Sequence, residues 1–347
     1  MEYRVLGRTG VRVSAHCLGA MMFGPWGNDD RNECVRIIHA ALDAGINFVD
    51  TADVYSEGIS EEIVGRAIQG RRDDVVLATK VHGRMGRGIN AGGNSRRWIL
   101  HEVEASLRRL GTDHIDLYQI HRPDRATSDE ETLEALTDLV RQGKVRYIGT
   151  SCYPGWRLVE CHWTSERRGL ARYACEQPPY SILARHIEED VLEVARRYGM
   201  GVIAWSPLAG GWLAGKYRRG AEPPGDSRMV RFRGRPGRPQ QRFDLERPEV
   251  RRKLDVVEDL LSIAEEAGAP LAHVAVAFTL AHPGVTSAII GPRTMDHLED
   301  LVKGADLRLD AATLDAIDRV VPPGTAVDPA DRGWDPPWME PSARRQA

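Results

Sequence analysis

The sequence predicts a single α/β domain with the (β/α)8, or TIM, barrel fold, and two observations carry this prediction. Short apolar segments typical of buried strands recur along the chain, and each is followed by a segment whose apolar residues repeat with the helical period. Eight such pairs can be counted, which is the number that closes a barrel, whereas a doubly wound sheet usually needs fewer strands. The 347 residues, 42% of them hydrophobic, are enough to fill one barrel. We therefore expect one barrel domain over residues 1–322.

The expected elements follow one another in a regular order. Residues 3–13 alternate in the manner of a small hairpin, with Gly7 and Gly10 around its turn. The barrel strands are expected around residues 16–21, 46–50, 75–79, 115–120, 145–149, 172–176, 201–205 and 286–290. The helices are expected at residues 32–44, 59–69, 95–109, 130–142, 155–168, 187–199, 251–267 and 294–302.

Two segments interrupt this order. Residues 207–250 form a long loop after the seventh strand, in which RRGAEPPGDSR and RFRGRPGRPQQR are rich in Gly, Pro and Arg. Because this composition cannot bury enough apolar surface to order alone, the loop is either a lid over the barrel mouth or a solvated segment. Its basic charge suits an anionic ligand in both cases. Residues 323–347 form an irregular tail, whose Trp334 and Trp338 we expect to fold back over the mouth.

Composition excludes several classes of function. A formal net charge of −3 gives no reason to expect nucleic acid or an anionic membrane as the main partner. Five cysteines without CxxC or Cys/His spacing support neither a disulfide framework nor a zinc site; they are Cys17, Cys34, Cys152, Cys161 and Cys175. The first residues, MEYRVLGRTG, lack the apolar core of a signal peptide, and no apolar run is long enough to cross a membrane. We expect a cytoplasmic protein whose chemistry requires no metal.

Four polar side chains are expected to meet at the barrel mouth, where the carboxyl ends of the strands lie. Asp50 and Tyr55 follow a short buried strand in NFVDTADVY, Lys80 ends the third strand in LATK, and His121 ends the fourth in LYQIH. A buried Lys80 would be costly unless paired, and Asp50 is a suitable counter-ion. The ammonium would lower the pKa of Tyr55 from about 10 toward working pH, which would make this residue a general acid. His121 would then orient the oxygen of a carbonyl substrate. Taken alone, NFVDTADVY also fits a purely structural role, in which Asp50 caps a turn and Tyr55 simply packs.

With these four residues in the phrases NFVDTADVY, RLGTDHIDLYQIHRPD and GKVRYIGTS, the chain from about residue 1 to 322 resembles the aldo-keto reductase superfamily. Asp50, Tyr55, Lys80 and His121 match the catalytic tetrad of that family. The resemblance implies reduction of a carbonyl to an alcohol by hydride transfer from NADPH, with Tyr55 as the proton donor. The long loop and the GxR motif, which is GPR at residues 291–293, resemble those of the bacterial branches that include potassium-channel β subunits and deoxysugar reductases.

The resemblance also implies a cofactor site for NADPH across the barrel mouth, and no GxGxxG fingerprint of a dinucleotide fold is present. Ser151 and Gln177 match residues that hydrogen-bond the nicotinamide carboxamide, and Trp205 matches an aromatic residue that stacks on the nicotinamide ring. The run WSPLAGGWLAGK would pass over the pyrophosphate, and its matching residues are Ser206, Leu208, Gly210 and Lys216.

At the adenosine end, IIGPRTMDHLED places Gly291, Arg293, His297 and Asp300 at the positions that the resemblance assigns to the cofactor. Arg293 resembles the ligand of the 2′-phosphate, which favours NADPH over NADH. The sequence departs from the family pattern where Cys152 and Leu301 stand in place of asparagine, and where His297 replaces the usual glutamine or arginine near the phosphate. Cys152 keeps only a weak hydrogen-bonding group in the cofactor site, and Leu301 removes an adenine contact.

The substrate and the partners are less defined by the sequence. Pocket walls are predicted at Met22, Trp26, Val54 and His82, with Trp212 from the long loop, and each has a role in the core or rim as its alternative. One rival function is a cofactor-sensing module like the channel β subunits, which would serve a partner protein. Another is a reductase of a nucleotide-linked keto-deoxysugar, whose diphosphate the basic loop 218–242 would bind. The sequence leaves the oligomeric state open.

Overall fold

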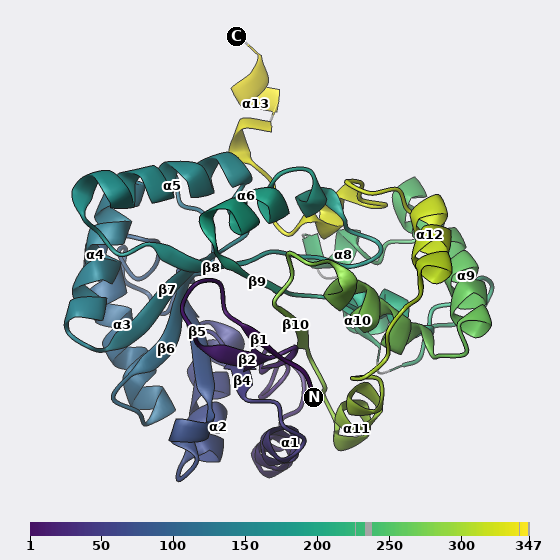
Figure 1. Cartoon of the computed structure of the whole chain (residues 1–347), viewed down its shortest axis with the longest axis horizontal. Coiled ribbons are helices and arrows are strands. Elements are labelled where there is room, and N and C mark those ends of the chain that lie inside the picture. The colour runs from purple at the N-terminus through teal and green to yellow at the C-terminus, as the bar shows by residue number, and fades with distance from the viewer. Residues whose placement is uncertain (226, 233–237, 340, 346–347) are drawn as a thin grey trace.

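Eight parallel strands close into a barrel in the computed structural model, which describes residues 1–347 except 226, 233–237, 340 and 346–347 (Figure 1). The hydrogen-bonded order is β10-β3-β4-β5-β6-β7-β8-β9, so each strand pairs with its neighbour in sequence and the last pairs with the first. The strands are β3 (His16–Gly19), β4 (Phe48–Asp50), β5 (Val76–Val81), β6 (Ile115–Ile120), β7 (Val145–Ser151), β8 (Tyr173–Gln177), β9 (Gly201–Ala204) and β10 (Ser287–Ile290). The predicted barrel is confirmed.

The predicted hairpin is also present, and it closes the end of the barrel opposite the mouth. Strands β1 (Tyr3–Val5) and β2 (Arg12–Ser14) pair antiparallel. Leu6 and Val13 of this hairpin are fully buried in one apolar cluster with the inward residues Phe48 and Leu117 of the barrel strands. Burying these side chains seals the barrel interior on this side, and the carboxyl ends of the strands lie at the other end, where barrels of this kind keep their sites.

Helices surround the barrel (Figure 1). Several begin where a side chain accepts a backbone hydrogen bond, as at Asp30, Ser95 and Ser128, and several end at a left-handed glycine such as Gly111. They are α1 (Arg31–Asp43), α2 (Ile59–Ile68), α3 (Arg96–Leu110), α4 (Asp129–Arg141), α5 (Gly155–Arg168), α6 (Val191–Tyr198), α9 (Pro248–Glu266), α10 (Leu271–Ala281), α11 (Met295–Lys303) and α12 (Ala311–Val320), with 3₁₀ turns η2 (Arg72–Asp74) and η3 (His186–Glu188). The eight predicted helices correspond to α1–α6, α9 and α11.

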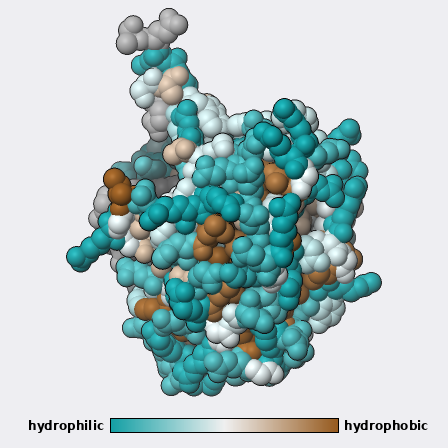
Figure 2. Space-filling model, turned by 90° about the vertical axis from the view of Figure 1, so that its left-hand side faces the viewer, coloured by the Kyte–Doolittle hydropathy of each residue, from teal (hydrophilic) through white to brown (hydrophobic). Residues whose placement is uncertain are grey.

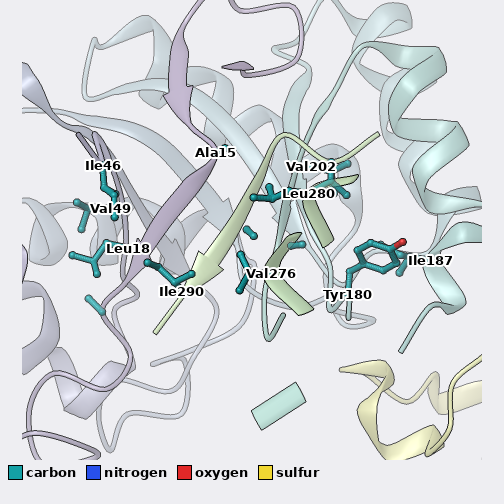
Figure 3. Close-up of a cluster of buried hydrophobic side chains, with 14 of the residues drawn as sticks. Ala15, Leu18, Ile46, Val49, Tyr180, Ile187, Val202, Val276, Leu280 and Ile290 are labelled. Atoms are coloured by element: carbon teal, nitrogen blue, oxygen red, sulfur yellow. The ribbon is translucent and has the colours of Figure 1, made fainter. Parts of the chain in front are cut away.

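Neither α10 nor α12 was predicted from the sequence, and α10 packs directly against β10. Residues 274–280 of this helix are buried without interruption, so its apolar residues do not repeat with the helical period that reveals a half-exposed helix. Figure 3 shows Val276 and Leu280 of α10 between Ile290 of β10 and Val202 of β9, in the main apolar cluster outside the barrel.

The long loop after β9 is built around its own aromatic core. It carries η4 (Ala209–Ala214), α7 (Arg228–Phe232) and α8 (Arg238–Gln241), while residues 233–237 of the predicted RFRGRPGRPQQR stretch lie outside the described residues. Trp212 is fully buried, with its ring 4.9 Å from that of Tyr217 and stacked on Phe243 at 5.9 Å. The described part of the loop therefore packs as a cap on the barrel.

The tail follows α12 as three short turns, η5 (Pro329–Arg332), η6 (Pro337–Met339) and α13 (Pro341–Arg344), and α13 projects away from the barrel (Figure 1). Gly333 reaches the strand ends, because a Cβ on it would lie 2.8 Å from the ring of Trp205. Trp338 instead packs against Trp156 of α5, with ring centroids 5.8 Å apart.

The surface is mostly hydrophilic on the face shown in Figure 2, with scattered apolar side chains. Among the described residues no single helix has the length and apolar character to cross a membrane. The pair α9 and α10 meets that test together, but the two helices are bent by 89° at their junction.

Candidate active site

The four predicted catalytic residues lie at the carboxyl ends of three neighbouring strands. Asp50 is the last residue of β4, Lys80 lies near the end of β5, and His121 directly follows β6. Tyr55 lies in η1 (Tyr55–Gly58), the 3₁₀ turn that leads from β4 into α2. The parallel pairing of β4, β5 and β6 is what brings these positions to one edge of the barrel.

Lys80 is the centre of this group and has no exposed surface. Its Nζ atom donates to Asp50 Oδ2 at 2.5 Å, to the Thr51 carbonyl at 2.7 Å and to the Tyr55 hydroxyl at 3.2 Å. The second oxygen of Asp50 accepts from Gln177 Nε2 at 2.8 Å. A buried ion pair is tolerated when its remaining hydrogen-bonding capacity is used in this way.

The sequence prediction that Lys80 lowers the pKa of Tyr55 was wrong in its net direction. Burial raises the pKa of Tyr55 above 10, and the Lys80 ammonium opposes this only in part because Asp50 also raises it. The hydroxyl of Tyr55 is therefore protonated at neutral pH, which is the state that a proton donor requires.

His121 is held beside Tyr55 as a neutral imidazole. The two rings meet edge to face, with centroids 5.7 Å apart and planes at 81°. Burial lowers the pKa of His121 well below 6.5, and its neighbours Arg122, Lys80 and His82 lower it further. A neutral imidazole can still donate one hydrogen bond to a carbonyl oxygen.

A buried charge network that was not predicted from the sequence lies beneath the Tyr55 turn. Arg109 of α3 donates to Glu61 Oε2 at 2.6 Å and to Glu102 Oε1 at 2.5 Å. A Cβ on Gly58 would lie 2.7 Å from the Arg109 side chain, so this arginine packs directly against η1. Arg109 is far from Tyr55 in sequence, and no local motif joins the two positions.

Ser151, Cys152, Gln177 and Trp205 lie at neighbouring strand ends, as the resemblance implied. Ser151 Oγ donates to the Gln177 carbonyl at 2.7 Å, and the Gln177 amide is engaged with Asp50. Trp205 follows β9 and has the Arg122 guanidinium 5.9 Å from its ring centroid. Cys152 is nearly buried, with φ 61°.

The start of the long loop combines strained backbone with a group of cations. Ser206 and Ala209 have φ of 61° and 49°, a region that costs a non-glycine residue about 1–3 kcal/mol and is concentrated at functional sites. Gly210 has φ +73°, and a Cβ there would lie 3.4 Å from Arg242 Nη2 and 3.8 Å from Arg228 Nη1. Leu208 directly precedes η4 and packs against the core.

The cations near Gly210 repel one another, which is the arrangement expected of an anion site. Burial lowers the pKa of Arg228 to about 10, and Arg242, Arg231 and Arg293 lower it further, while Tyr217 raises it. Of the cations in this region, only Lys216 and Arg293 were predicted individually from the sequence. Lys216 lies by the neighbouring glycine, since a Cβ on Gly211 would be 3.9 Å from its Nζ. Arg228, Arg231 and Arg242 were not predicted individually, because the composition of a basic loop does not show which arginines bind a ligand and which are solvated.

The residues of the adenosine end surround the start of α11. Gly291 has open space where a Cβ would lie, and the Arg293 carbonyl accepts from Asn28 at 2.8 Å. His297 donates its backbone N–H to the Thr294 cap. Asp300 lies 3.3 Å from His273 Nε2, and Leu301 is buried in the core.

The predicted substrate walls divide into two groups. Trp26 is 44% exposed and its ring lies 6.2 Å from that of Tyr55, which places it at the mouth. Val54 packs against Gly83, His82 Nδ1 lies 2.9 Å from Asn94 Oδ1, and Met22 is buried. Trp212 does not line the pocket: it is fully buried in the core of the loop.

Trp212 is buried in the loop, and not in a pocket wall, for a simple physical reason. Its ring covers apolar surface of Tyr217 and Phe243, and its Nε1–H donates to the Arg242 carbonyl at 3.2 Å. A buried indole whose single donor is already used has no group left for a substrate. A separate cavity of about 540 Å³, lined by Ile89, Trp98 and other residues near the start of α3, contains none of the site residues.

Comparison with known proteins agrees with this geometry. The model of the aldo/keto reductase family matches residues 16–322. The uncharacterized oxidoreductase YrpG of Bacillus subtilis is 41% identical over 346 residues, which cover 96% of this chain and 100% of the relative. A probable voltage-gated potassium channel subunit beta of Arabidopsis thaliana is 36% identical, covering 92% of this chain and 97% of the relative. Versiconal hemiacetal acetate reductase of Aspergillus parasiticus is 34% identical, covering 96% and 100%. The chain belongs to the aldo/keto reductase family.

Proposed function

We propose that the protein is an NADPH-dependent oxidoreductase that reduces a small-molecule aldehyde or ketone to an alcohol. The observation that carries this proposal is the position of the protonated Tyr55 hydroxyl, 3.2 Å from Lys80 Nζ and beside the neutral His121 ring. A carbonyl oxygen placed between Tyr55 and His121 would accept a hydrogen bond from each, so that the carbon becomes more electrophilic.

The proton step follows from the same contacts. As the carbonyl oxygen gains negative charge, Tyr55 transfers its hydroxyl proton to that oxygen and becomes a phenolate, which Lys80 stabilises. Asp50 keeps Lys80 in place through the 2.5 Å ion pair. Solvent then returns a proton to Tyr55. Bound NADPH would supply the hydride that completes the alcohol carbon.

The residues present suit a phosphorylated dinucleotide. Arg228 and Arg242 face the left-handed Gly210, so a diphosphate at this backbone would relieve the repulsion between the two guanidinium groups. Trp205 offers an aromatic face at the end of β9 for the nicotinamide ring. Arg293, at the start of α11, would bind the 2′-phosphate and favour NADPH over NADH. The five free cysteines support a reducing, cytoplasmic setting.

The names of the relatives support two different roles. The Aspergillus relative is named as a reductase, in line with an enzyme. The Arabidopsis relative is named as a channel subunit, which supports a second candidate, a binding module that serves a partner protein. The two candidates differ in whether turnover occurs.

The test is NADPH oxidation by the purified protein with a panel of aldehydes, ketones, quinones and keto-sugar nucleotides, with NADH in parallel. Turnover with a member of the panel supports the reductase, and the best substrate separates small carbonyls from sugar nucleotides. NADPH binding without turnover on any of them would contradict the reductase and favour the module.

A further inference from the structure

The C-terminal tail is fixed to the barrel before it reaches the long loop. Val327 N–H donates to the Leu183 carbonyl at 3.0 Å, and Arg185 N–H donates to the Thr325 carbonyl at 2.7 Å. Between them, Ala326 and the segment after β8 form an antiparallel bridge. These backbone bonds bring residues 328–333, which we call the tail clasp, against the loop that follows β9.

Two buried carboxylates of the tail clasp are paired with cations at the end of the loop. Lys253 of α9 has no exposed surface, and its Nζ lies 2.7 Å from Asp331 Oδ2 and 3.2 Å from Asp328 Oδ2. Arg247 adds contacts of 3.1 and 3.3 Å to the two oxygens of Asp328. Burial alone would raise the pKa of Asp328, but Lys253, the Ala330 N–H and Arg247 lower it on balance, so Asp328 is charged at neutral pH. Because buried charges must remain paired, the tail clasp and the loop are held together.

Arg242 connects this cluster with the anion site. Its Nε donates to Asp331 Oδ1 at 2.5 Å, and its carbonyl accepts from Trp212 at 3.2 Å and from Lys253 at 3.4 Å. Both ends of the residue are therefore fixed. Neither terminal nitrogen donates to another side chain or carbonyl in the described part of the chain, and Nη2 faces the backbone of Gly210. A guanidinium held through Nε keeps its two terminal nitrogens for phosphate oxygens.

The tail clasp also closes on the aromatic side of the site. A cavity of about 10 Å³, lined by Ser206, Ala209, Arg242 and Asp331 among others, separates clasp and loop, which is room for one water at most. Gly333 has φ +82°, and a Cβ on it would lie 2.8 Å from Trp205 and 3.2 Å from Cys152 Sγ. The clasp thus contacts residues at both the predicted diphosphate end and the predicted nicotinamide end.

We propose that the tail clasp retains the bound dinucleotide, and that Asp331 is a positioning residue that aims the terminal nitrogens of Arg242 at the diphosphate. The inference rests on the proposed function, because the diphosphate of NADPH is the ligand. Asp331 itself touches neither the reacting atoms nor the Tyr55 group. Its removal therefore changes how long NADPH stays bound, and leaves the hydride step of the loaded enzyme as it was.

The experiment measures NADPH release from the full-length protein by stopped-flow fluorescence, with excess NADP⁺ as the displacing ligand. Asp331→Asn keeps the shape of the side chain and removes its charge. We expect it to raise the release rate about tenfold, which corresponds to about 1.4 kcal/mol. The single-turnover rate of the preloaded enzyme is expected to stay within about twofold of wild type.

A matched control and a second variant complete the design. Glu258→Gln removes an exposed ion pair between the same loop and the same helix, since Glu258 pairs with Arg218 at 2.8 Å, and it should not change the release rate. Arg242→Lys keeps the cation but not the fork, and should accelerate release. The double variant, with both Arg242→Lys and Asp331→Asn, should release NADPH no faster than the faster of the two single variants, because both substitutions act through one guanidinium.

Release at the wild-type rate from Asp331→Asn would overturn the proposal, as would additive effects in the double variant. If Asp331→Asn does not fold, unchanged release from Arg242→Lys overturns it instead. In each of these cases a wild-type protein that binds NADPH and reduces carbonyls leaves the proposed function intact. A wild-type protein that does not bind NADPH would overturn both.

Discussion

Lys80 and Tyr55 come from neighbouring strand ends, and the Lys80 ammonium donates to the Tyr55 hydroxyl at 3.2 Å inside a site with no water access to Lys80. This contact gives the phenol a partner that stabilises its anion without lowering its resting pKa below 10. The proton is therefore retained at neutral pH, as the proposed role of Tyr55 as a proton donor requires.

Replacing Lys80 with Met should both inactivate and destabilise the protein. The substitution leaves the carboxylate of Asp50 buried without its cation, which typically costs about 3–5 kcal/mol. Urea unfolding measures the loss, and Lys144→Met is the control, because its ion pair with Glu104 is partly exposed and should contribute about 0–1 kcal/mol. Equal losses from the two variants would show that burial of the Lys80 pair has no special cost.

The rate of reduction should depend little on pH between about 6.5 and 10. Tyr55 donates only while protonated, and since its pKa is raised above 10 by burial, the rate should fall only above that value. His121 is already neutral at pH 6.5, because burial lowers its pKa well below this value. Its titration therefore should not change the rate near neutral pH. The measurement is kcat/KM against pH for the NADPH-loaded protein. A fall centred near pH 8 would instead mean that the Tyr55 pKa is lowered.

Arg293→Ala should weaken NADPH binding about 10-fold to 100-fold, the range given by a hydrogen-bonded charge pair, and should change NADH binding little. The reason is that only NADPH carries a 2′-phosphate for the guanidinium. Fluorescence titration with both cofactors provides the comparison. Equal losses for the two would show that Arg293 does not contact the 2′-phosphate.

Glu176 should make the protein less stable as pH rises. This residue of β8 is fully buried, and burial raises its pKa from 4.5 to about 8 despite hydrogen bonds from Thr150 and the Tyr153 N–H. The folded state therefore holds a proton that the unfolded state releases above pH 4.5, so stability is complete below that value and is lost up to about pH 8. Urea unfolding at pH 5 and pH 8 should show this loss, and Glu176→Gln should reduce it. If Glu176→Gln leaves the change in unfolding free energy between pH 5 and pH 8 as it is in the wild type, other groups cause that change.

Much of the fold could be predicted because its signals are local. Each barrel strand is a short apolar run, and the order of strands fixes which side chains reach the mouth, so the approach of Asp50 to Lys80 followed from strand ends alone. Helix α10 was missed because it is apolar on all sides, which removes the helical period. Trp212 was wrongly predicted as a pocket wall because the sequence does not show whether a tryptophan in a loop faces a substrate or is buried in a core.

Other features depend on distances that no motif encodes. The pKa of Tyr55 is set by a balance between burial and the charges of Lys80 and Asp50, and the size of the burial effect requires the packed structure. The contact of Asp331 with Arg242 joins residues that are 89 positions apart. Their charges were visible in the sequence, but many other arginines in the same loop were equally suitable partners.

The most direct test of the account compares wild type with Tyr55→Phe in NADPH oxidation with the best carbonyl substrate. The variant removes one hydroxyl and little of the cofactor site, so turnover should fall by at least about 10²–10⁴-fold while NADPH binding, measured by fluorescence titration, stays near wild type. Tyr3→Phe is the matched control, because it also removes one tyrosine hydroxyl, which donates to the Gly45 carbonyl at 2.8 Å in the hairpin far from the mouth, and it should retain turnover. Undiminished turnover in Tyr55→Phe would contradict the assignment of Tyr55 as the proton donor, and with it the proposed mechanism.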